Sequence, residues 1–356
     1  MSNYENKKMI TPEDSRLSYM GRIDFSAKKV ATFIYPYSMV KFRIKGTSLK
    51  VILKNYHSFW NNYLGVIIDG VQHKILLSNE GETEYISIGE DLENKEHDII
   101  LFKRQDGCCY FDFYGLILSE NTVLLDKEKQ SSTRKIEFYG DSVTAGEVSE
   151  ALDYVGKSDP EHQGEYSNSW YSYASITARK LNAEVNLVAQ GGVALLDGTG
   201  YFVPPTYIGM ENVYDKLRYN PQLGQVTKWD FNQFTPHVVV VAIGQNDNHP
   251  EDYMKENYSG KKAMHWRSHY KHLIKRIRAN YPDALIILST TILMHHENWD
   301  QAIDDVCKEL ADKKVVHFMY SLNGKGTPGH IRIPEAEQMA EELTQFIESY
   351  EEEIWN

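Results

Sequence analysis

Residues 134–146 read RKIEFYGDSVTAG, and this stretch decides the fold of the second half of the chain. An apolar run of strand length, 134–139, ends in a glycine. Asp141 and Ser142 follow it, and both residue types favour the first positions of a helix. A strand that turns directly into a helix is typical of parallel α/β sheets, whose ligands sit beyond the carboxyl ends of the strands. The alternative is a turn that only caps the next helix.

Four further apolar runs of strand length follow, with helical patterns between them. In the helical segments apolar residues recur at steps of three and four, which places them on one face. The alternation predicts a three-layer α/β/α domain over 134–356 with a parallel sheet of about five strands. The other expected strands are 184–189, 237–243, 284–288 and 315–319, and the expected helices are 170–181, 266–277, 303–310 and 334–350.

The N-terminal half has a different pattern of apolar residues. Short runs rich in Val, Ile, Phe and Tyr are separated by turn residues, and Asp69-Gly70 and Asp106-Gly107 are strong hairpin signals. No helical period of useful length occurs there. The pattern predicts a β-sandwich of jelly-roll type over 1–125, with 126–133 as a polar linker. Its expected strands are 39–44, 49–53, 64–68, 73–77, 84–88, 98–102 and 109–117.

Composition excludes several classes of function. The 356 residues include 38 Lys and Arg against 50 Asp and Glu, a net charge of −12, which disfavours nucleic acid and anionic membranes as partners. The 3 cysteines form no disulfide framework, and their spacing does not suit zinc. Residues 1–17 contain no apolar core of a signal peptide, and no apolar run is long enough to span a membrane. We therefore expect a cytoplasmic protein without a metal. The oligomeric state stays open.

Polar groups follow the predicted parallel strands at the edge where those strands end. Ser142 comes after the first strand, 190–192 (QGG) after the second and 244–247 (GQND) after the third, and His330 lies in the loop after the last. A hydroxyl, a closely approaching backbone N–H, a side-chain amide and an imidazole are the groups that nucleophilic acyl transfer uses. Taken singly, each also fits a plain turn or a solvated loop.

Together these segments resemble the motifs of the SGNH, or GDSL-like, hydrolases. The matching segments are 140–142 (GDS), 244–247 (GQND) and 329–330 (GH), and the likeness extends from 134 to the C-terminus. A late histidine after this pair of motifs is fairly specific to that family.

The predicted sandwich ahead of this domain narrows the resemblance to carbohydrate esterase family 2. Segments 21–25 (GRIDF), 66–70 (VIIDG) and 169–179 (SWYSYASITAR) are similar to that family, so the likeness covers most of the chain. Its members are acetyl esterases that act on acetylated plant polysaccharides, chiefly of the xylan and mannan types.

The resemblance implies a serine esterase that needs no cofactor. Ser142 attacks the acetyl carbonyl, and His330 acts as general base and then returns the proton to the sugar oxygen. The oxyanion rests on the N–H groups of Ser142 and Gly191 and on the Asn246 amide, with Gly192 as the open alternative to Gly191.

One position departs from the pattern of many SGNH enzymes. They place an aspartate three residues before the histidine, where this chain has Thr327. A threonine hydroxyl or a backbone carbonyl can accept the imidazole N–H, but neither carries a charge. We therefore predict a Ser–His dyad in which Thr327 or a backbone carbonyl orients His330.

Candidate substrate-binding residues are Trp299, Asn248 and His249. Trp299 follows the fourth predicted parallel strand and its loop, and is a candidate for stacking on a sugar ring; the alternative is an anchor in the core. Asn248 and His249 follow the Asn246 motif, and the alternative is a solvated loop. Trp60 of the sandwich can reach the site if the two domains pack closely; the favoured alternative is an aromatic of the sandwich core or of a hairpin.

The predicted function is removal of O-acetyl groups from hemicellulose-derived manno- or xylo-oligosaccharides. Without a signal peptide, the expected substrate is an imported oligosaccharide rather than a polymer. The alternatives are an SGNH hydrolase of another short acyl ester, a sugar acetyl transesterase, and a carbohydrate-binding protein without catalysis. The sequence does not choose the sugar or the acetylated hydroxyl.

Overall fold

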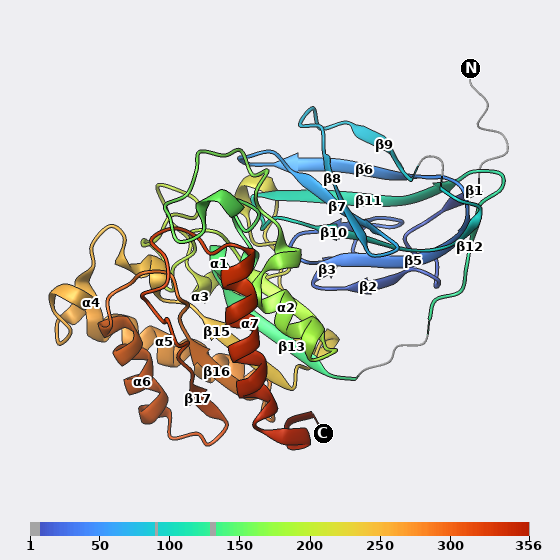
Figure 1. Cartoon of the computed structure of the whole chain (residues 1–356). Coiled ribbons are helices and arrows are strands. Elements are labelled where there is room, and N and C mark those ends of the chain that lie inside the picture. Colours follow the sequence, from blue (N-terminus) through green and yellow to red (C-terminus); the bar gives the residue numbers. More distant parts are fainter. Residues whose placement is uncertain (1–7, 90–91, 129–132, 356) are drawn as a thin grey trace.

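The N-terminal half of the computed structural model consists of two six-stranded antiparallel sheets packed face to face (Figure 1). The structure describes residues 8–89, 92–128 and 133–355. Residues 1–7 at the N-terminus and residues 129–132 of the predicted linker lie outside them. One sheet has the order β3-β4-β11-β6-β9 with β1 on β11, and the other β12-β5-β10-β7-β8 with β2 on β5. The strands are β1 Lys8–Ile10, β2 Ser18–Met20, β3 Ile23–Asp24, β4 Ala31–Phe33, β5 Met39–Gly46, β6 Leu49–His57, β7 Tyr63–Ile68, β8 Val71–Leu76, β9 Thr83–Ile88, β10 Lys95–Lys103, β11 Cys109–Leu118 and β12 Val123–Leu124.

Alternating side chains of these strands build the core between the two sheets. Val40 and Phe42 of one sheet are buried against the same apolar cluster as Phe33 and Phe111 of the other. The rings of Phe33 and Phe111 stack with centroids 4.7 Å apart. Strands with one face in a core and one face outward form because polar and apolar residues alternate along them. The seven strands predicted in this half correspond to β5–β11, so the predicted sandwich is confirmed.

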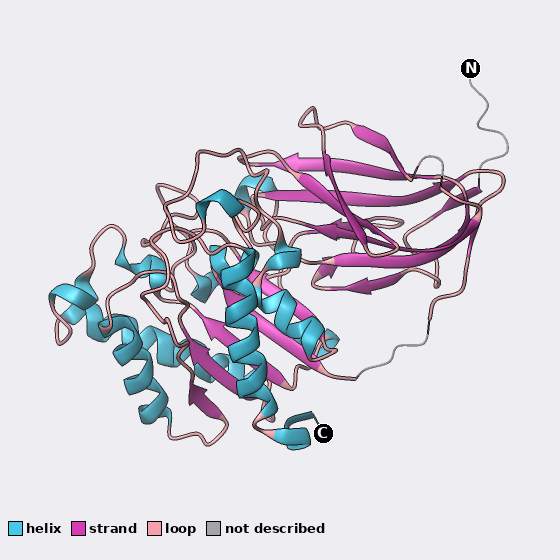
Figure 2. Ribbon diagram, in the orientation of Figure 1, coloured by secondary structure: helices cyan, strands magenta, loops and turns pink. Residues whose placement is uncertain are grey.

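The C-terminal half is built on a five-stranded parallel sheet of order β14-β13-β15-β16-β17. Its strands are confirmed as predicted within a few residues, and helices cover both faces (Figure 2). On β15, Val239 and Val241 pack toward α5 and α6, whereas Val238 and Val240 pack toward α2 and α7. The strands are β13 Lys135–Gly140, β14 Glu184–Ala189, β15 Val238–Ala242, β16 Leu285–Ser289 and β17 Val315–His317. The helices are α1 Ser142–Ala145, α2 Tyr173–Lys180, α3 Met210–Val213, α4 Tyr253–Glu256, α5 Lys261–Asn280, α6 Asn298–Leu310 and α7 Ile333–Glu348, with 3-10 turns η1 Leu152–Tyr154, η2 Ser169–Tyr171, η3 Pro221–Leu223, η4 Phe231–Gln233, η5 Gln245–Asn248 and η6 Glu351–Trp355. No helix in the described ranges combines the length and apolarity that crossing a membrane requires.

A buried ion pair fastens the two halves together. Arg22, at the start of the sandwich, is fully buried and donates from Nη2 to Glu137 Oε1 on β13 at 2.9 Å. Its Nη1 donates to the Tyr214 carbonyl at 2.7 Å, and its guanidinium lies 4.9 Å from the centroid of the Trp229 ring. Glu137 Oε2 accepts the Tyr281 hydroxyl at 2.7 Å. Because a buried charge needs this many partners, the two halves are held at a defined orientation.

Candidate active site

The turn after β13 places Ser142 at the carboxyl edge of the parallel sheet. Asp141 caps α1, and its carboxylate accepts the Val143 N–H at 3.0 Å. Gly140 has no room for a side chain, because a Cβ there would lie 2.0 Å from Thr144 Oγ1. Ser142 is only 4% exposed, so the hydroxyl sits in a shielded position. The strand-to-helix turn predicted from 134–146 is confirmed.

His330 has a carboxylate partner that no sequence pattern indicated. Asp159, between η1 and η2, accepts Nδ1 of His330 at 2.5 Å and the backbone N–H of His330 at 2.9 Å. The buried guanidinium of Arg332 donates to the same carboxylate at 2.8 Å. Gly329 permits this approach, since a Cβ there would lie 2.7 Å from Asp159 Oδ1. A carboxylate only accepts, so the imidazole proton is on Nδ1 and Nε2 is left to act as a base.

The predicted dyad with Thr327 behind the imidazole is therefore wrong. Thr327 is 1% exposed, and its hydroxyl has no hydrogen-bond partner among the described residues. Its carbonyl accepts the Met294 N–H at 2.9 Å and so anchors the loop after β16. The orienting group is the side chain of Asp159, which lies 171 residues from His330 along the chain.

The charges around His330 stabilise its protonated form. Burial lowers the pKa of His330, but the nearby charges of Glu147 and Asp159 outweigh this effect and raise the pKa to about 9. Burial also raises the pKa of Asp159, yet the hydrogen bonds from His330 and Arg332 hold it well below its usual range. The His330–Asp159 pair therefore favours the ionised state, and Nε2 is available as a base in the fraction of molecules with a neutral imidazole, which grows as the pH rises.

The loop after β14 changes the expected set of oxyanion donors. The Gly191 N–H donates to Asp106 Oδ2 at 2.6 Å, and Gln190 Nε2 donates to the same oxygen at 2.8 Å. The predicted donor Gly191 thus has a protein partner, supplied by the loop between β10 and β11. Gly192 has a φ of +71°, and its N–H has no hydrogen-bond partner in the part of the chain that the structure describes. Of the two glycines, Gly192, the alternative left open, is thus the one whose N–H is not engaged by another described residue.

The turn η5 brings Asn246 next to the nucleophile turn. Its side-chain nitrogen donates to the Val193 carbonyl at 3.0 Å and lies 3.5 Å from Asp141 Oδ2. Gln245 donates to the same Asp141 oxygen at 2.9 Å and accepts the Thr291 N–H at 2.8 Å. The loops after β13, β14, β15 and β16 therefore meet in one hydrogen-bonded network around the residue before Ser142.

The expectation that Trp299 contacts substrate is wrong. Trp299 is fully buried at the start of α6, where its ring packs edge-on against Trp266 with centroids 5.4 Å apart. Its Nε1 donates to Asp252 Oδ1 at 3.1 Å. The alternative given for Trp299, an anchor in the core, is confirmed, because α6 directs this side chain into the core. Asn248 and His249 are half-buried at the end of η5.

An aromatic pair next to Gly192 offers a better-placed surface for a sugar. The Tyr201 ring, 53% exposed, stacks on His249 with centroids 4.2 Å apart at 25°. The Tyr201 N–H donates to the Gly192 carbonyl at 2.8 Å, which fixes the pair beside the candidate oxyanion donor. An exposed, anchored ring of this kind can pack against a flat apolar face with little ordering of its own.

The sandwich reaches this site through the loop between β6 and β7. Trp60 packs on His162 with ring centroids 4.6 Å apart, and the Asn61 N–H donates to the Gln163 carbonyl at 2.9 Å. Both contacts hold the segment that carries Asp159. Trp60 also lines a small cavity together with Asp106 and Glu147. The two domains do pack closely enough for Trp60 to reach the site.

Sequence reasoning missed Asp159, Asp106 and Glu147. Asp159 and Asp106 are ordinary acidic residues in polar loops that only the fold brings to His330 and Gly191, whereas Glu147 directly follows the turn that carries Ser142. A weak signal was present at Asp106, where an Asp-Gly turn is flanked by the unusual buried pair Cys108 and Cys109.

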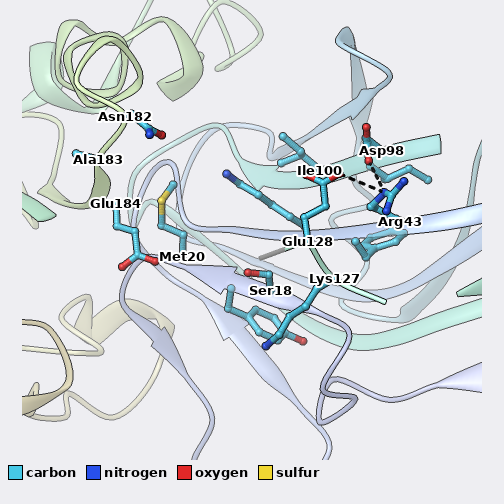
Figure 3. A pocket seen from close by; sticks show the side chains of 14 residues that line it. Ser18, Met20, Arg43, Asp98, Ile100, Lys127, Glu128, Asn182, Ala183 and Glu184 are labelled. Atoms are coloured by element: carbon cyan, nitrogen blue, oxygen red, sulfur yellow. Dashed lines mark hydrogen bonds and ion pairs between the residues drawn. The ribbon is translucent and has the colours of Figure 1, made fainter. Parts of the chain in front are cut away.

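A larger hollow lies elsewhere, between the sandwich and the loop before β14 (Figure 3). Its volume is about 360 Å³. Arg43 on its wall pairs with Asp98 at 3.0 Å, and Glu184 of β14 stands across from Met20. None of the residues that line it belongs to the set around Ser142 and His330.

Two family models match successive parts of the chain. Residues 19–127 match the carbohydrate esterase 2 N-terminal domain, and residues 138–330 match the GDSL-like lipase/acylhydrolase family. The cellulase/esterase CelE of Acetivibrio thermocellus is 28% identical over 95% of this chain, which spans only 40% of the length of that relative. An acetylxylan esterase/glucomannan deacetylase of Cellvibrio japonicus is 23% identical, over 94% of this chain and 89% of that protein. A structure of a family two carbohydrate esterase from Clostridium thermocellum in complex with cellohexaose has a TM-score of 0.77 and 28% identity, and covers 94% of this chain and 98% of its own.

Proposed function

This chain belongs to the GDSL-like lipase/acylhydrolase family, with the N-terminal domain of carbohydrate esterase family 2, and we propose that it is a serine esterase that removes O-acetyl groups from manno- or xylo-oligosaccharides. The observation that carries the proposal is the His330–Asp159 pair, which holds a proton on Nδ1 so that the neutral imidazole presents Nε2 as a base, in the same domain as the shielded Ser142. The relatives named as esterases and as an acetylxylan esterase/glucomannan deacetylase support the acetyl group and the sugar class.

In the proposed reaction Ser142 Oγ attacks the acetyl carbonyl carbon. His330 Nε2 takes the hydroxyl proton as the Oγ–C bond forms, and returns it to the sugar oxygen as the ester C–O bond breaks. Water then attacks the acetyl-enzyme as His330 Nε2 takes its proton, and His330 returns that proton to Ser142 Oγ as the Oγ–C bond breaks and acetate leaves. Asp159 keeps the proton on Nδ1 throughout and stabilises the imidazolium that forms in each half-reaction.

The negative oxygen of the tetrahedral intermediate needs donors that are in place beforehand. We assign the Ser142 N–H and the Gly192 N–H to this role, together with the Asn246 side-chain amide, which must turn from the Val193 carbonyl and Asp141 to reach the oxyanion. Removing one such donor from an acyl-transfer enzyme typically costs about 3 kcal/mol of transition-state stabilisation. For sugar binding we assign the Tyr201–His249 pair, with Asn248 next to it as a hydroxyl partner.

The test is acetate release from acetylated manno- and xylo-oligosaccharides by the wild type and by Ser142→Ala, with Ser268→Ala as the matched control on an exposed face of α5. We expect release by the wild type and the control and none above background by Ser142→Ala, and the faster substrate identifies the sugar class. Retained release by Ser142→Ala overturns the choice of nucleophile. Cleavage of p-nitrophenyl acetate without release from either sugar overturns the substrate class and leaves the serine chemistry standing.

A further inference from the structure

A further hollow lies next to the aromatic pair that we assign to sugar binding. Its volume is about 520 Å³, within the range of about 300–1,000 Å³ that small-molecule sites occupy. Residues of the loop after β14, of the segment after η5 and of the first turns of α5 line it. The Gly200 N–H donates to the His249 carbonyl at 3.1 Å, and the next residue, Pro250, is part of the wall. A sugar chain that stacks on Tyr201 can therefore continue into this hollow.

The first turn of α5, at the edge of the hollow, carries charges of the opposite sign to those that a helix N-terminus favours. Lys261 and Lys262 are its first two residues, the turn contains no acidic residue, and the N-cap Gly260 makes no side-chain hydrogen bond. The free N–H groups at a helix start carry partial positive charge, so cations there are unfavourable and anions are attracted. An anion bound at this turn would stabilise it.

The protein supplies only part of the negative charge that this turn attracts. Glu251, on the wall of the hollow, forms an ion pair with Lys262. Lys261 is exposed and forms no ion pair with any residue in the described ranges. The sequence of α5 contains no Asp or Glu at all, although the chain as a whole has a net charge of −12. The hollow therefore presents an uncompensated cation beside the helix start.

A buried hydroxyl in the wall is an independent indication of a ligand. Tyr253 is only 7% exposed, and its hydroxyl has no hydrogen-bond partner among the described residues. Its ring packs edge-on against Trp299 with centroids 5.3 Å apart, so the side chain is held in place where it lines the hollow. Buried tyrosine hydroxyls usually have a partner, because leaving one without a hydrogen bond costs free energy. A sugar hydroxyl can provide that partner.

We propose that this hollow binds a uronic acid unit of the oligosaccharide, with the carboxylate on Lys261 and the first N–H groups of α5, and a ring hydroxyl on Tyr253. The inference rests on the proposed function and narrows its substrate class to acetylated oligosaccharides that carry an acidic sugar. The carboxylate matches the cation and the uncapped helix start, and the sugar ring matches the volume and the tyrosine hydroxyl. An inorganic anion matches only the first two features.

The experiment compares two substrates of the same shape and different charge. One is an acetylated xylo-oligosaccharide with a glucuronic acid branch, and the other carries a glucose branch at the same position. The measured quantity is the ratio of their kcat/KM values for acetate release, in the wild type, Lys261→Gln and Lys261→Glu. The control is Lys275→Gln, which removes the same charge from an exposed position about 21 Å further along α5.

The wild type and Lys275→Gln should favour the acidic substrate about three- to ten-fold at low salt, mainly through KM. The ratio should fall to about one in Lys261→Gln and below one in Lys261→Glu, and added salt should reduce it in the wild type. Tyr253→Phe should raise the KM for both substrates and keep the wild-type ratio, because it removes only the hydroxyl. A wild-type ratio of one, or the same ratio in the wild type and Lys261→Gln, overturns the inference.

Binding to a variant without the nucleophile tests the hollow independently of the chemistry. Calorimetry measures the affinity of the deacetylated acidic oligosaccharide for Ser142→Ala, with and without Lys261→Gln. Weaker binding in the double variant supports the inference even if the wild type releases no acetate, which would be a failure of the proposed function instead. Equal affinities overturn the inference. So does inorganic phosphate that binds as tightly as the oligosaccharide and is lost in Lys261→Gln, since the site would then serve a free anion.

Discussion

A histidine that takes a proton from a serine needs one nitrogen free and the other held in its protonated form. In this chain the holding group is the Asp159 carboxylate, 2.5 Å from Nδ1 of His330. The buried Arg332 keeps that carboxylate in place at 2.8 Å, so the ring is oriented by a residue that is itself fixed. Thr327 occupies the position where many relatives of this fold carry the acid, and it makes only a backbone contact there.

Asp159→Asn tests this assignment. The amide presents an N–H as readily as an oxygen to Nδ1, so the imidazole loses its preferred tautomer and the charge that stabilises its cation. We expect kcat to fall by about 10²- to 10⁴-fold with little change in KM. Steady-state kinetics on an acetylated oligosaccharide measure both parameters.

Thr327→Val is the matched control, because it removes a buried hydroxyl that has no partner among the described residues. Its kcat should stay within about two-fold of the wild type, since no hydrogen bond is lost. A large loss of kcat in Thr327→Val with little loss in Asp159→Asn would restore the predicted dyad.

Some of the site was predictable from residue order, and some was not. Ser142, Asn246 and the loop glycines follow strands whose apolar runs are unambiguous, so their common edge followed from the parallel sheet. Asp159 sits in a long polar loop without a local pattern, and only tertiary packing brings it to His330. Trp299 was misassigned because its position after a strand suggested an edge residue, whereas the first turn of α6 directs it into the core.

At the scale of elements, the segment between η1 and η2 connects the two halves of the site. One end of it carries Asp159, and the middle is clamped by the loop between β6 and β7 through Trp60 and Asn61. Strands β5–β11 were all predictable because the alternation of apolar and polar residues extends over six or more residues in each of them. The strands β1–β4 and β12 have only two or three residues each, and neighbouring strands determine them. The contacts of Trp60 and Asn61 with the segment between η1 and η2 also depend on tertiary packing, so no local sequence pattern predicts them.

Trp60→Ala should disturb catalysis without contacting the ester. Loss of the ring frees His162 and loosens the segment that positions Asp159, so we expect kcat for p-nitrophenyl acetate to fall about ten-fold. Tyr85→Ala, an exposed aromatic elsewhere on the sandwich, is the control and should leave kcat unchanged. If Trp60→Ala changes only the KM for oligosaccharides, Trp60 is a sugar contact and not a clamp.

At the scale of the whole molecule, the Arg22–Glu137 pair makes the sandwich and the parallel sheet one structure. Arg22 lies in the segment 21–25 that opens the sandwich, and Glu137 lies on the strand that leads to Ser142. A second pair, Arg218 to Asp24 at 2.5 Å, joins the same two regions. Two ion pairs therefore join the N-terminal segment of the sandwich to the C-terminal half.

Arg22→Met leaves the Glu137 carboxylate buried without its cation. We expect the free energy of unfolding to fall by about 3–5 kcal/mol, because an unpaired buried charge is costly. Urea denaturation measures it, and the wild type should unfold in a single transition. Arg43→Met removes an arginine from the exposed pairs with Glu96 and Asp98, and this control should cost no more than about 1 kcal/mol. An equal effect of the two substitutions would contradict the role of the buried pair.

The Arg22–Glu137 pair also limits how this protein can be recombined with its relatives. A chimaera that takes its sandwich from a homologue imports whatever residue stands at the position of Arg22, and Glu137 remains on β13 of the recipient. Unless Arg22 and Glu137 come from the same parent protein, the chimaera buries an unpaired charge on β13, the strand that leads to Ser142. A crossover point in the loop after Gly140 therefore preserves the Arg22–Glu137 pair, which one in the linker separates, and Arg218 must then match Asp24 of the donor.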